Sequence, residues 1–189
     1  MAFLDFPPVV AWRHREARDG FEVVFFSGRR VEGHTAAVEE GEAWAVRYAI
    51  ELAPDWTTRS AHVVARSASG EQALSLEGDG AGRWLIDGAP AGRLDGLLDV
   101  DLESSAFTNA LPVHRLGLEI GQAADAPAVY VRALDLRVER LEQRYARIDD
   151  DGPRQRYDYS AARFDYADRL VYDEHGLVLD YPGLAVRAA

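Results

Sequence analysis

The sequence predicts an all-β protein, mainly a single large antiparallel sheet curled into a barrel-like roll, with at most one or two short helices. Apolar and polar residues alternate with a period of two from residue 21 onward, which is typical of half-buried strands. Glycine-containing turns recur about every eight to twelve residues. Helical periodicity is confined to short segments. Many short strands joined by tight turns favour an antiparallel sheet that curls or closes.

The clearest strand lies at residues 44–52, where Trp44, Val46, Tyr48 and Ile50 alternate with small or polar residues. Residues two apart on a strand share a face, so these side chains are predicted to face the core. The same alternation predicts further strands at residues 21–27, 30–38, 57–66, 73–77, 83–87, 97–102, 115–119, 128–138, 141–148, 154–160, 162–172 and 177–181.

The segments between these strands carry turn residues, for example Ser27-Gly28 and Asp87-Gly88. A short helix is predicted at residues 107–113, which Pro112 interrupts, and a turn is predicted near the N-terminus. Residues 121–127 are predicted to form a surface loop. No repeat or flexible linker divides the chain, so we expect a single domain over residues 1–189.

Composition excludes several classes of protein. Hydrophobic residues make up 48% of the chain, which is ordinary for a globular protein and excludes a disordered one. The formal charge of −11 argues against nucleic acid as a partner, because phosphates attract clustered basic residues. All 21 basic residues are arginine, which excludes Schiff-base and phosphate-loop lysine chemistry.

The chain also contains no cysteine, which excludes disulfides, thiolate nucleophiles and cysteine-based zinc sites. The five histidines include no pair at metal-ligand spacing, so we predict no metal and no cofactor. No basic segment precedes the short apolar run at the N-terminus, and no window reaches the ~18 to 20 apolar residues that span a bilayer. We therefore expect a cytoplasmic protein without a transmembrane segment.

Two aspartates mark the strand predicted at residues 97–102. Asp99 and Asp101 share one face of it and Val100 and Leu102 the other. Carboxylates two apart on a strand are about 6.6 Å apart, near the lower limit for an inverting glycosidase. Such an enzyme also needs one carboxyl kept protonated by apolar surroundings, of which the neighbouring sequence gives no sign. Three roles stay open for the pair: structural or solvated, hydrogen bonding to a ligand, and acid/base catalysis.

A polar bend follows, which gathers Ser104, Ser105, Thr108, Asn109, His114 and Arg115 within a dozen residues. Thr108 and Asn109 suit a structural role, because short polar side chains bond neighbouring backbone groups and favour turns. They also suit the border of a binding site, where Arg115 could contact the polar end of a ligand.

Aromatic residues supply the last group of candidates. They include Trp44, Trp84, Tyr130 and six of the eight tyrosines, which lie between Tyr145 and Tyr181. Flat rings with a polar edge suit the face of a sugar or the mouth of an apolar pocket. They suit cross-strand packing equally well.

The block D-V-D-L, followed by T-N-x-L-P and H-R-L, with G-L-V-L-D-Y-P-G-L near the end, resembles the "Putative glycolipid-binding" family of small bacterial proteins. The likeness runs from Trp12-Arg13 to the final Tyr-Pro-Gly. The resemblance implies a large antiparallel roll, similar to the half-barrels of bacterial lipoprotein carriers. It also implies that the T-N-x-L-P segment borders the site.

We therefore predict a noncatalytic protein that holds the acyl chains of a glycolipid or another small-molecule amphiphile in an apolar groove with a polar rim. The predicted ligand-binding residues are Asp99, Asp101, Thr108, Asn109, Arg115, Trp44, Trp84 and Tyr130. The alternative is a glycoside-hydrolase-like enzyme that uses Asp99 and Asp101 as an acid/base pair. A third possibility is an interaction module whose sheet edge pairs with another protein, and the sequence leaves the oligomeric state open.

Overall fold

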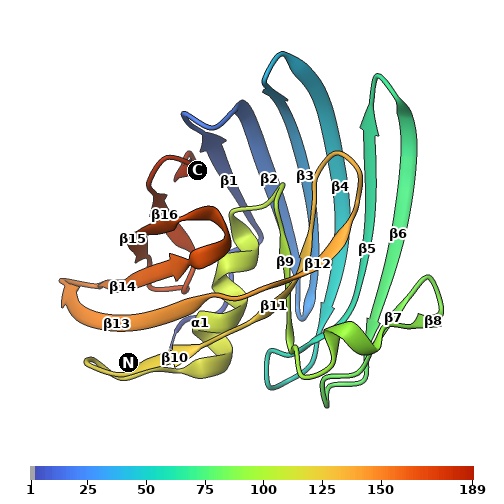
Figure 1. The fold of residues 1–189 in the computed structure, drawn as a ribbon. Coiled ribbons are helices and arrows are strands. Elements are labelled where there is room, and N and C mark those ends of the chain that lie inside the picture. Colours follow the sequence, from blue (N-terminus) through green and yellow to red (C-terminus); the bar gives the residue numbers. More distant parts are fainter. Residues whose placement is uncertain (1–2) are drawn as a thin grey trace.

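The computed structural model describes residues 3–189 and confirms the all-β class, with a large curled antiparallel sheet and one short α-helix (Figure 1). The large sheet has 14 strands, in the order β10-β13-β14-β15-β16-β17-β1-β2-β3-β4-β5-β6-β7-β8. The bounds of these strands are β1 (Val9–His14), β2 (Asp19–Ser27), β3 (Arg30–Glu39), β4 (Glu42–Leu52), β5 (Thr58–Ser67), β6 (Gly70–Gly78), β7 (Trp84–Ile86), β8 (Ala89–Pro90), β10 (Ala123–Asp125), β13 (Arg144–Asp151), β14 (Arg154–Ala161), β15 (Tyr166–Tyr172), β16 (Val178–Tyr181) and β17 (Ala185–Arg187).

Strands β2 to β6 form a regular meander whose alternation decides which face is buried. On β4, Trp44, Val46, Tyr48 and Ile50 are all buried on the concave side, as the alternation predicted. Register follows the tight turns, so that Val46 lies opposite Thr35 on β3 and Ala65 on β5. The two edges of the sheet are short strands, β8 and β10, and short edges present few unpaired backbone groups to other chains.

The ends of the described chain meet in the middle of the sheet. Strand β1 pairs with β2 on one side and with β17 on the other, with Trp12 opposite Arg187. Trp12 is fully buried, and its indole Nε1 donates to the Val178 carbonyl at 2.7 Å. The sequence prediction missed β1, β8, β10 and β17, because each is short or, for β1, was taken as a turn.

A second layer fills most of the concave side of the sheet. It contains a three-stranded sheet, in the order β12-β11-β9, and a helical segment that follows β9 (Figure 1). The strands are β9 (Asp99–Leu102), β11 (Ala128–Val131) and β12 (Val138–Leu141), and the helical turns are η2 (Phe107–Asn109) and α1 (Ala110–Leu116). The sequence analysis expected these strands to belong to the one antiparallel sheet. Instead they form a sheet of their own, in which β9 runs parallel to β11.

This inner layer supplies much of the core. Val100, Phe107, Ala110 and Leu111 are fully buried against the sheet. An apolar interior that could hold a long acyl chain is therefore largely occupied by the protein's own side chains.

Three further predictions on local structure were wrong. The single strand predicted at residues 128–138 is divided into β11 and the start of β12, which pair antiparallel with each other. The predicted strand at residues 115–119 is not formed, because residues 115–116 are the end of α1 and the chain leaves the helix after them. Helix α1 continues through Pro112 because that residue lies in the first helical turn. The helix ends at Gly117, whose φ of 53° is left-handed and whose N–H bonds to the Val113 carbonyl. The predicted strand at residues 162–172 begins instead with the turn η3 (Ala162–Phe164). The remaining helical turn is η1 (Gly92–Leu94), and no helix among residues 3–189 is long and apolar enough to cross a bilayer.

Candidate functional site

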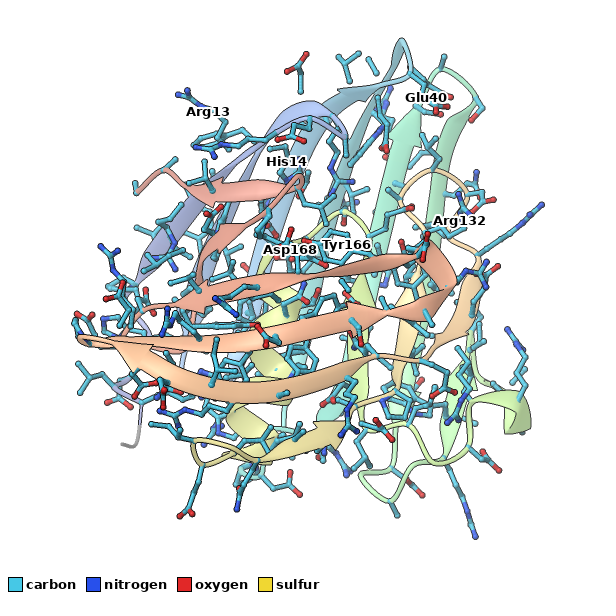
Figure 2. The ribbon with its side chains drawn as sticks, turned by 60° about the vertical axis from the view of Figure 1, so that its left-hand side comes forward. Arg13, His14, Glu40, Arg132, Tyr166 and Asp168 are labelled. Carbon is cyan, nitrogen blue, oxygen red and sulfur yellow. The ribbon has the colours of Figure 1, made fainter. Side chains whose placement is uncertain are left out.

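A cavity of about 270 Å³ lies between the curled sheet and the inner layer. We call it the tyrosine pocket, and define it by Asp101, Tyr130, Tyr159, Phe164, Tyr166 and Tyr181. The sheet contributes side chains from β1, β3 and β14 to β17, and the inner layer contributes side chains from β9, β11, β12 and the loop after β9. Figure 2 labels two of the lining residues, His14 at the end of β1 and Tyr166 on β15.

Three neighbouring strands place three tyrosine rings on the same wall. Tyr159, Tyr166 and Tyr181 come from β14, β15 and β16. Their ring centroids are 5.9 Å apart for Tyr159 and Tyr166, 6.0 Å for Tyr159 and Tyr181, and 5.7 Å for Tyr166 and Tyr181. The rings of Tyr130 and Phe164 also line the pocket and pack against each other, with their centroids 5.4 Å apart. The pocket is therefore walled by aromatic rings at contact distance.

The wall tyrosines are neutral phenols with part of their hydrogen bonding satisfied by the protein. The Tyr159 hydroxyl donates to Oε1 of Gln143 at 2.9 Å, and the Tyr166 hydroxyl donates to the Pro182 carbonyl at 2.9 Å. Burial raises the pKa of both hydroxyls, and also that of Tyr181, above the ordinary value. These bonds fix the rings in place.

Asp101 is the buried carboxylate of the tyrosine pocket. Its Oδ1 accepts a hydrogen bond from the Thr108 hydroxyl at 2.9 Å. The oxygen of that hydroxyl in turn accepts a hydrogen bond from the Leu102 N–H at 3.2 Å. No basic side chain among residues 3–189 forms an ion pair with Asp101. Burial raises the pKa of Asp101 to about 6, and the charges of Asp99 and Glu103 add to the effect. At neutral pH the carboxylate is therefore ionised without a counter-charge.

Asp99 has a different role, although it lies only two residues away. Arg115 donates to both of its carboxylate oxygens, from Nε at 2.8 Å and from Nη2 at 2.6 Å. The Asp99 side chain has no exposed surface. Burial alone would lower the pKa of Arg115, but the hydrogen bonds and charge of Asp99 raise it. The pair ties β9 to α1.

This geometry does not support the hydrolase alternative. Only Asp101 lines the pocket, whereas Asp99 is held in an ion pair away from it. An acid/base pair needs both carboxyl groups beside the bond that is cleaved. Neither aspartate is solvated, so the solvated interpretation is also wrong.

His14 and Arg18 complete the polar side of the pocket, and sequence reasoning missed both. Arg18 Nε donates to His14 Nδ1 at 2.9 Å, so the neutral imidazole carries its proton on Nε2. Burial lowers the pKa of His14 to about 3, and the nearby charge of Arg18 lowers it further. His14 Nε2 is buried and has no hydrogen-bond partner among residues 3–189. The alternation of Val10, Trp12 and His14 was the available signal for His14, whereas Arg18 lies outside that strand and had no such signal.

Of the other predicted residues, Asn109 and Tyr130 line the tyrosine pocket. Asn109 Oδ1 accepts the Tyr145 hydroxyl at 3.0 Å. Thr108 supports Asp101 from behind. Trp44 is buried outside the pocket, with the Arg18 guanidinium 5.3 Å from its ring centroid.

Trp84 lies away from the pocket altogether. It packs in the core, and its Nε1 donates to the Leu97 carbonyl at 2.8 Å. The structure thus places Asp101, Asn109 and Tyr130 on the wall of the pocket, with Thr108 behind Asp101. The other four predicted residues, Asp99, Arg115, Trp44 and Trp84, do not line it.

The loop after β9 is anchored by a buried glutamate. Glu22 on β2 is fully buried. Its Oε1 accepts a hydrogen bond from the Tyr48 hydroxyl at 2.7 Å, and its Oε2 accepts one from the Ala106 N–H at 2.8 Å. Thr35 adds a hydrogen bond to the Ser104 carbonyl at 2.8 Å. These bonds hold the part of the loop that lines the tyrosine pocket against the sheet.

A second, larger cavity of about 950 Å³ lies toward the other end of β14. We call it the aromatic groove, and define it by Phe6, Phe26, Trp56 and His114. The Trp56 and His114 rings stack with centroids 3.9 Å apart, and burial lowers the pKa of His114 to about 4. Among residues 3–189, no cluster of three His, Cys, Asp or Glu side chains could hold a metal ion.

These features define a class of protein: a curled antiparallel sheet that encloses an aromatic, acidic pocket on its concave side. The chain belongs to the family described as "Putative glycolipid-binding", whose model matches residues 9–187. It is similar to the crystal structure of a DUF1089 family protein from Pseudomonas aeruginosa, with 34% sequence identity, a TM-score of 0.81, and coverage of 87% of this chain and 90% of that one. No curated protein matches the chain.

Proposed function

We propose that the protein binds a glycolipid or a related amphiphile without transforming it, and that the sugar head group enters the tyrosine pocket. The observation that carries the proposal is the combination, in one cavity, of tyrosine walls with a buried carboxylate and a buried unpartnered imidazole N–H. Aromatic faces cover the apolar face of a sugar ring, and a few placed polar groups orient its hydroxyls. The family description supports the same class of ligand.

The size of the pocket limits which part of the ligand it takes. A volume of about 270 Å³ is equivalent to about nine water molecules, at about 30 Å³ each, and lies just below the usual range for ligand pockets. We therefore place the head group inside and the acyl chain outside. Phe164, which is 46% exposed, and Leu184 line the pocket, and they offer an apolar surface for the first methylenes of the chain.

The commitment of Asp99 to Arg115 supports a noncatalytic role, because Asp99 is then not available as the partner of Asp101 in an acid/base pair. The single-domain organisation over residues 1–189 and the cytoplasmic location both stay predictions from the sequence.

The test is a titration with dodecyl β-D-glucoside below its micelle concentration, followed by native mass spectrometry and calorimetry. Tyr181→Leu removes one wall of the tyrosine pocket, and Trp56→Leu makes a matched change in the aromatic groove. We expect one bound molecule in the native protein, a loss of about tenfold in affinity for Tyr181→Leu, and little change for Trp56→Leu. Loss of binding in Trp56→Leu alone would move the site to the aromatic groove, and no binding by the native protein would refute the proposed function.

A further inference from the structure

The charges that line the tyrosine pocket do not balance. Asp101, Glu39 and Glu103 line it, and Arg18 is the charged base among its described lining residues, because His14 is neutral. Arg18 Nη1 lies 3.8 Å from Glu39, and its Nη2 donates to the Glu103 carbonyl at 2.6 Å. With Arg18 opposed by Glu39, the pocket keeps an excess of negative charge.

Asp101 is the carboxylate that this excess leaves unpaired. The side-chain hydrogen bond that it accepts comes from the neutral Thr108 hydroxyl. Asp101 lines the same cavity as the rings of Tyr130, Tyr159 and Tyr181, which come from three different strands. A buried anion without a partner is costly, and aromatic faces attract cations. Both features favour a positively charged group at this position.

The imidazole of His14 favours a ligand that carries a hydrogen-bond acceptor. The side chain is 3% exposed and lines the same pocket, and its Nε2–H has no partner among residues 3–189. A buried donor without an acceptor is destabilising, so a bound ligand that offers an oxygen here gains a hydrogen bond that the free protein lacks.

We infer that the head group bound in the tyrosine pocket is an amino sugar, whose ammonium group lies beside Asp101 among the tyrosine rings and whose hydroxyl or ring oxygen accepts from His14 Nε2. This inference rests on the proposed function and specifies the chemical class of its ligand. A neutral sugar leaves the charge of Asp101 uncompensated, and an acidic sugar is repelled by it. An amino sugar offers a positive charge to Asp101 and an oxygen acceptor to the Nε2–H of His14.

The experiment compares two soluble probes that differ in one group, methyl β-D-glucoside and methyl β-D-glucosaminide, in which an amine replaces the 2-hydroxyl. Their affinities are measured by calorimetry at pH 7 at millimolar concentrations. We expect the glucosaminide to bind about tenfold more tightly to the native protein, because a hydrogen bond to a charged group is worth at least that factor. In Asp101→Asn, which keeps the oxygen that accepts from Thr108, the preference should fall to within about twofold.

Asp158→Asn is the matched control, because Asp158 is an exposed acid that pairs with Arg169 on the outer face of β14. It should keep the full preference. Methyl N-acetyl-β-D-glucosaminide removes the charge from the ligand instead of from the protein, so it tests the inference on the native protein without any substitution. His14→Phe should weaken both probes alike, because they share the oxygens that accept from Nε2.

Equal affinity of the two probes for the native protein would overturn the inference and leave the proposed function standing. A preference that persists in Asp101→Asn, or in the N-acetyl probe, would overturn the role of the carboxylate. If dodecyl β-D-glucoside does not bind the native protein, the proposed function fails, and the inference fails with it because it rests on that function.

Discussion

The buried ion pair between Asp99 and Arg115 predicts a large and pH-dependent stability change. Arg115→Met keeps the apolar stem and removes both hydrogen bonds to Asp99, whose side chain has no exposed surface. A carboxylate left without a partner in such a site takes up a proton instead of staying charged. At pH 7, protonating a carboxyl group with an ordinary pKa near 3.9 costs about 4 kcal/mol, at about 1.4 kcal/mol per pKa unit. We therefore expect the free energy of unfolding to fall by about 3 to 4 kcal/mol.

The pH dependence distinguishes this mechanism from simple loss of packing. Burial already raises the pKa of Asp99 in the native protein, and the loss of Arg115 raises it further in the variant. The contribution of this carboxyl group to stability is therefore complete below about pH 4 and is lost as the pH rises. At pH 5 the same proton costs about 1.5 kcal/mol, and the deficit should shrink to that value. Urea unfolding followed by tryptophan fluorescence at pH 5 and pH 7 measures both numbers.

The control is Arg144→Met, which breaks an exposed ion pair with Asp125 of similar length, 2.8 Å. Exposed pairs are worth under about 1 kcal/mol, so this variant should lose little at either pH. A loss below about 1 kcal/mol for Arg115→Met at pH 7, or an equal loss at both pH values, would show that the pair is not the buried anchor described above.

Three further predictions follow from other buried groups. Asp101→Asn should make the ligand-free protein about 2 to 3 kcal/mol more stable at pH 8 and leave it unchanged at pH 4 in urea unfolding, because a folded pKa of about 6 means that Asp101 destabilises the fold progressively as the pH rises. Glu22→Gln should cost about 1 to 3 kcal/mol and speed hydrogen exchange of the Ala106 amide, which loses a carboxylate acceptor; unchanged exchange would contradict the role of Glu22 as the loop anchor. Gly33→Ala should lower the midpoint of thermal unfolding, because a Cβ there would overlap the Tyr48 ring; an unchanged midpoint would show that the ring moves freely.

The tyrosine pocket depends on residues that are far apart in the sequence. His14 comes from the first strand and Tyr181 from β16, and β1 and β16 both pair with β17. Asp101 reaches the same cavity from the inner layer. The pocket is therefore assembled when the two ends of the described chain join the sheet, which predicts that ligand binding stabilises the pairing of β1 with β17.

Part of this site could be predicted from local sequence. Asp101, Thr108 and Asn109 lie within nine residues of one another, so the strand-to-bend pattern is enough to predict that they lie close together, as they do in the structure. The same pattern could not separate Asp101 from Asp99, because their different roles depend on Arg115, which reaches Asp99 only when α1 folds back over β9. Trp84 was misleading for a similar reason, since an isolated tryptophan has the same sequence signature in a core as at a binding site.

The sequence by itself determined the all-β class and the long strands, because period-two alternation on residues such as Val46 and Ile50 is a local property that fixes which face of a strand is buried. Only the tertiary structure decided that β9, β11 and β12 form a separate layer that fills the concave side, and that a pocket remains beside Asp101. Parallel pairing of β9 with β11 and the closure of β1 on β17 join segments distant in sequence, and no local pattern encodes which distant segment a strand will meet.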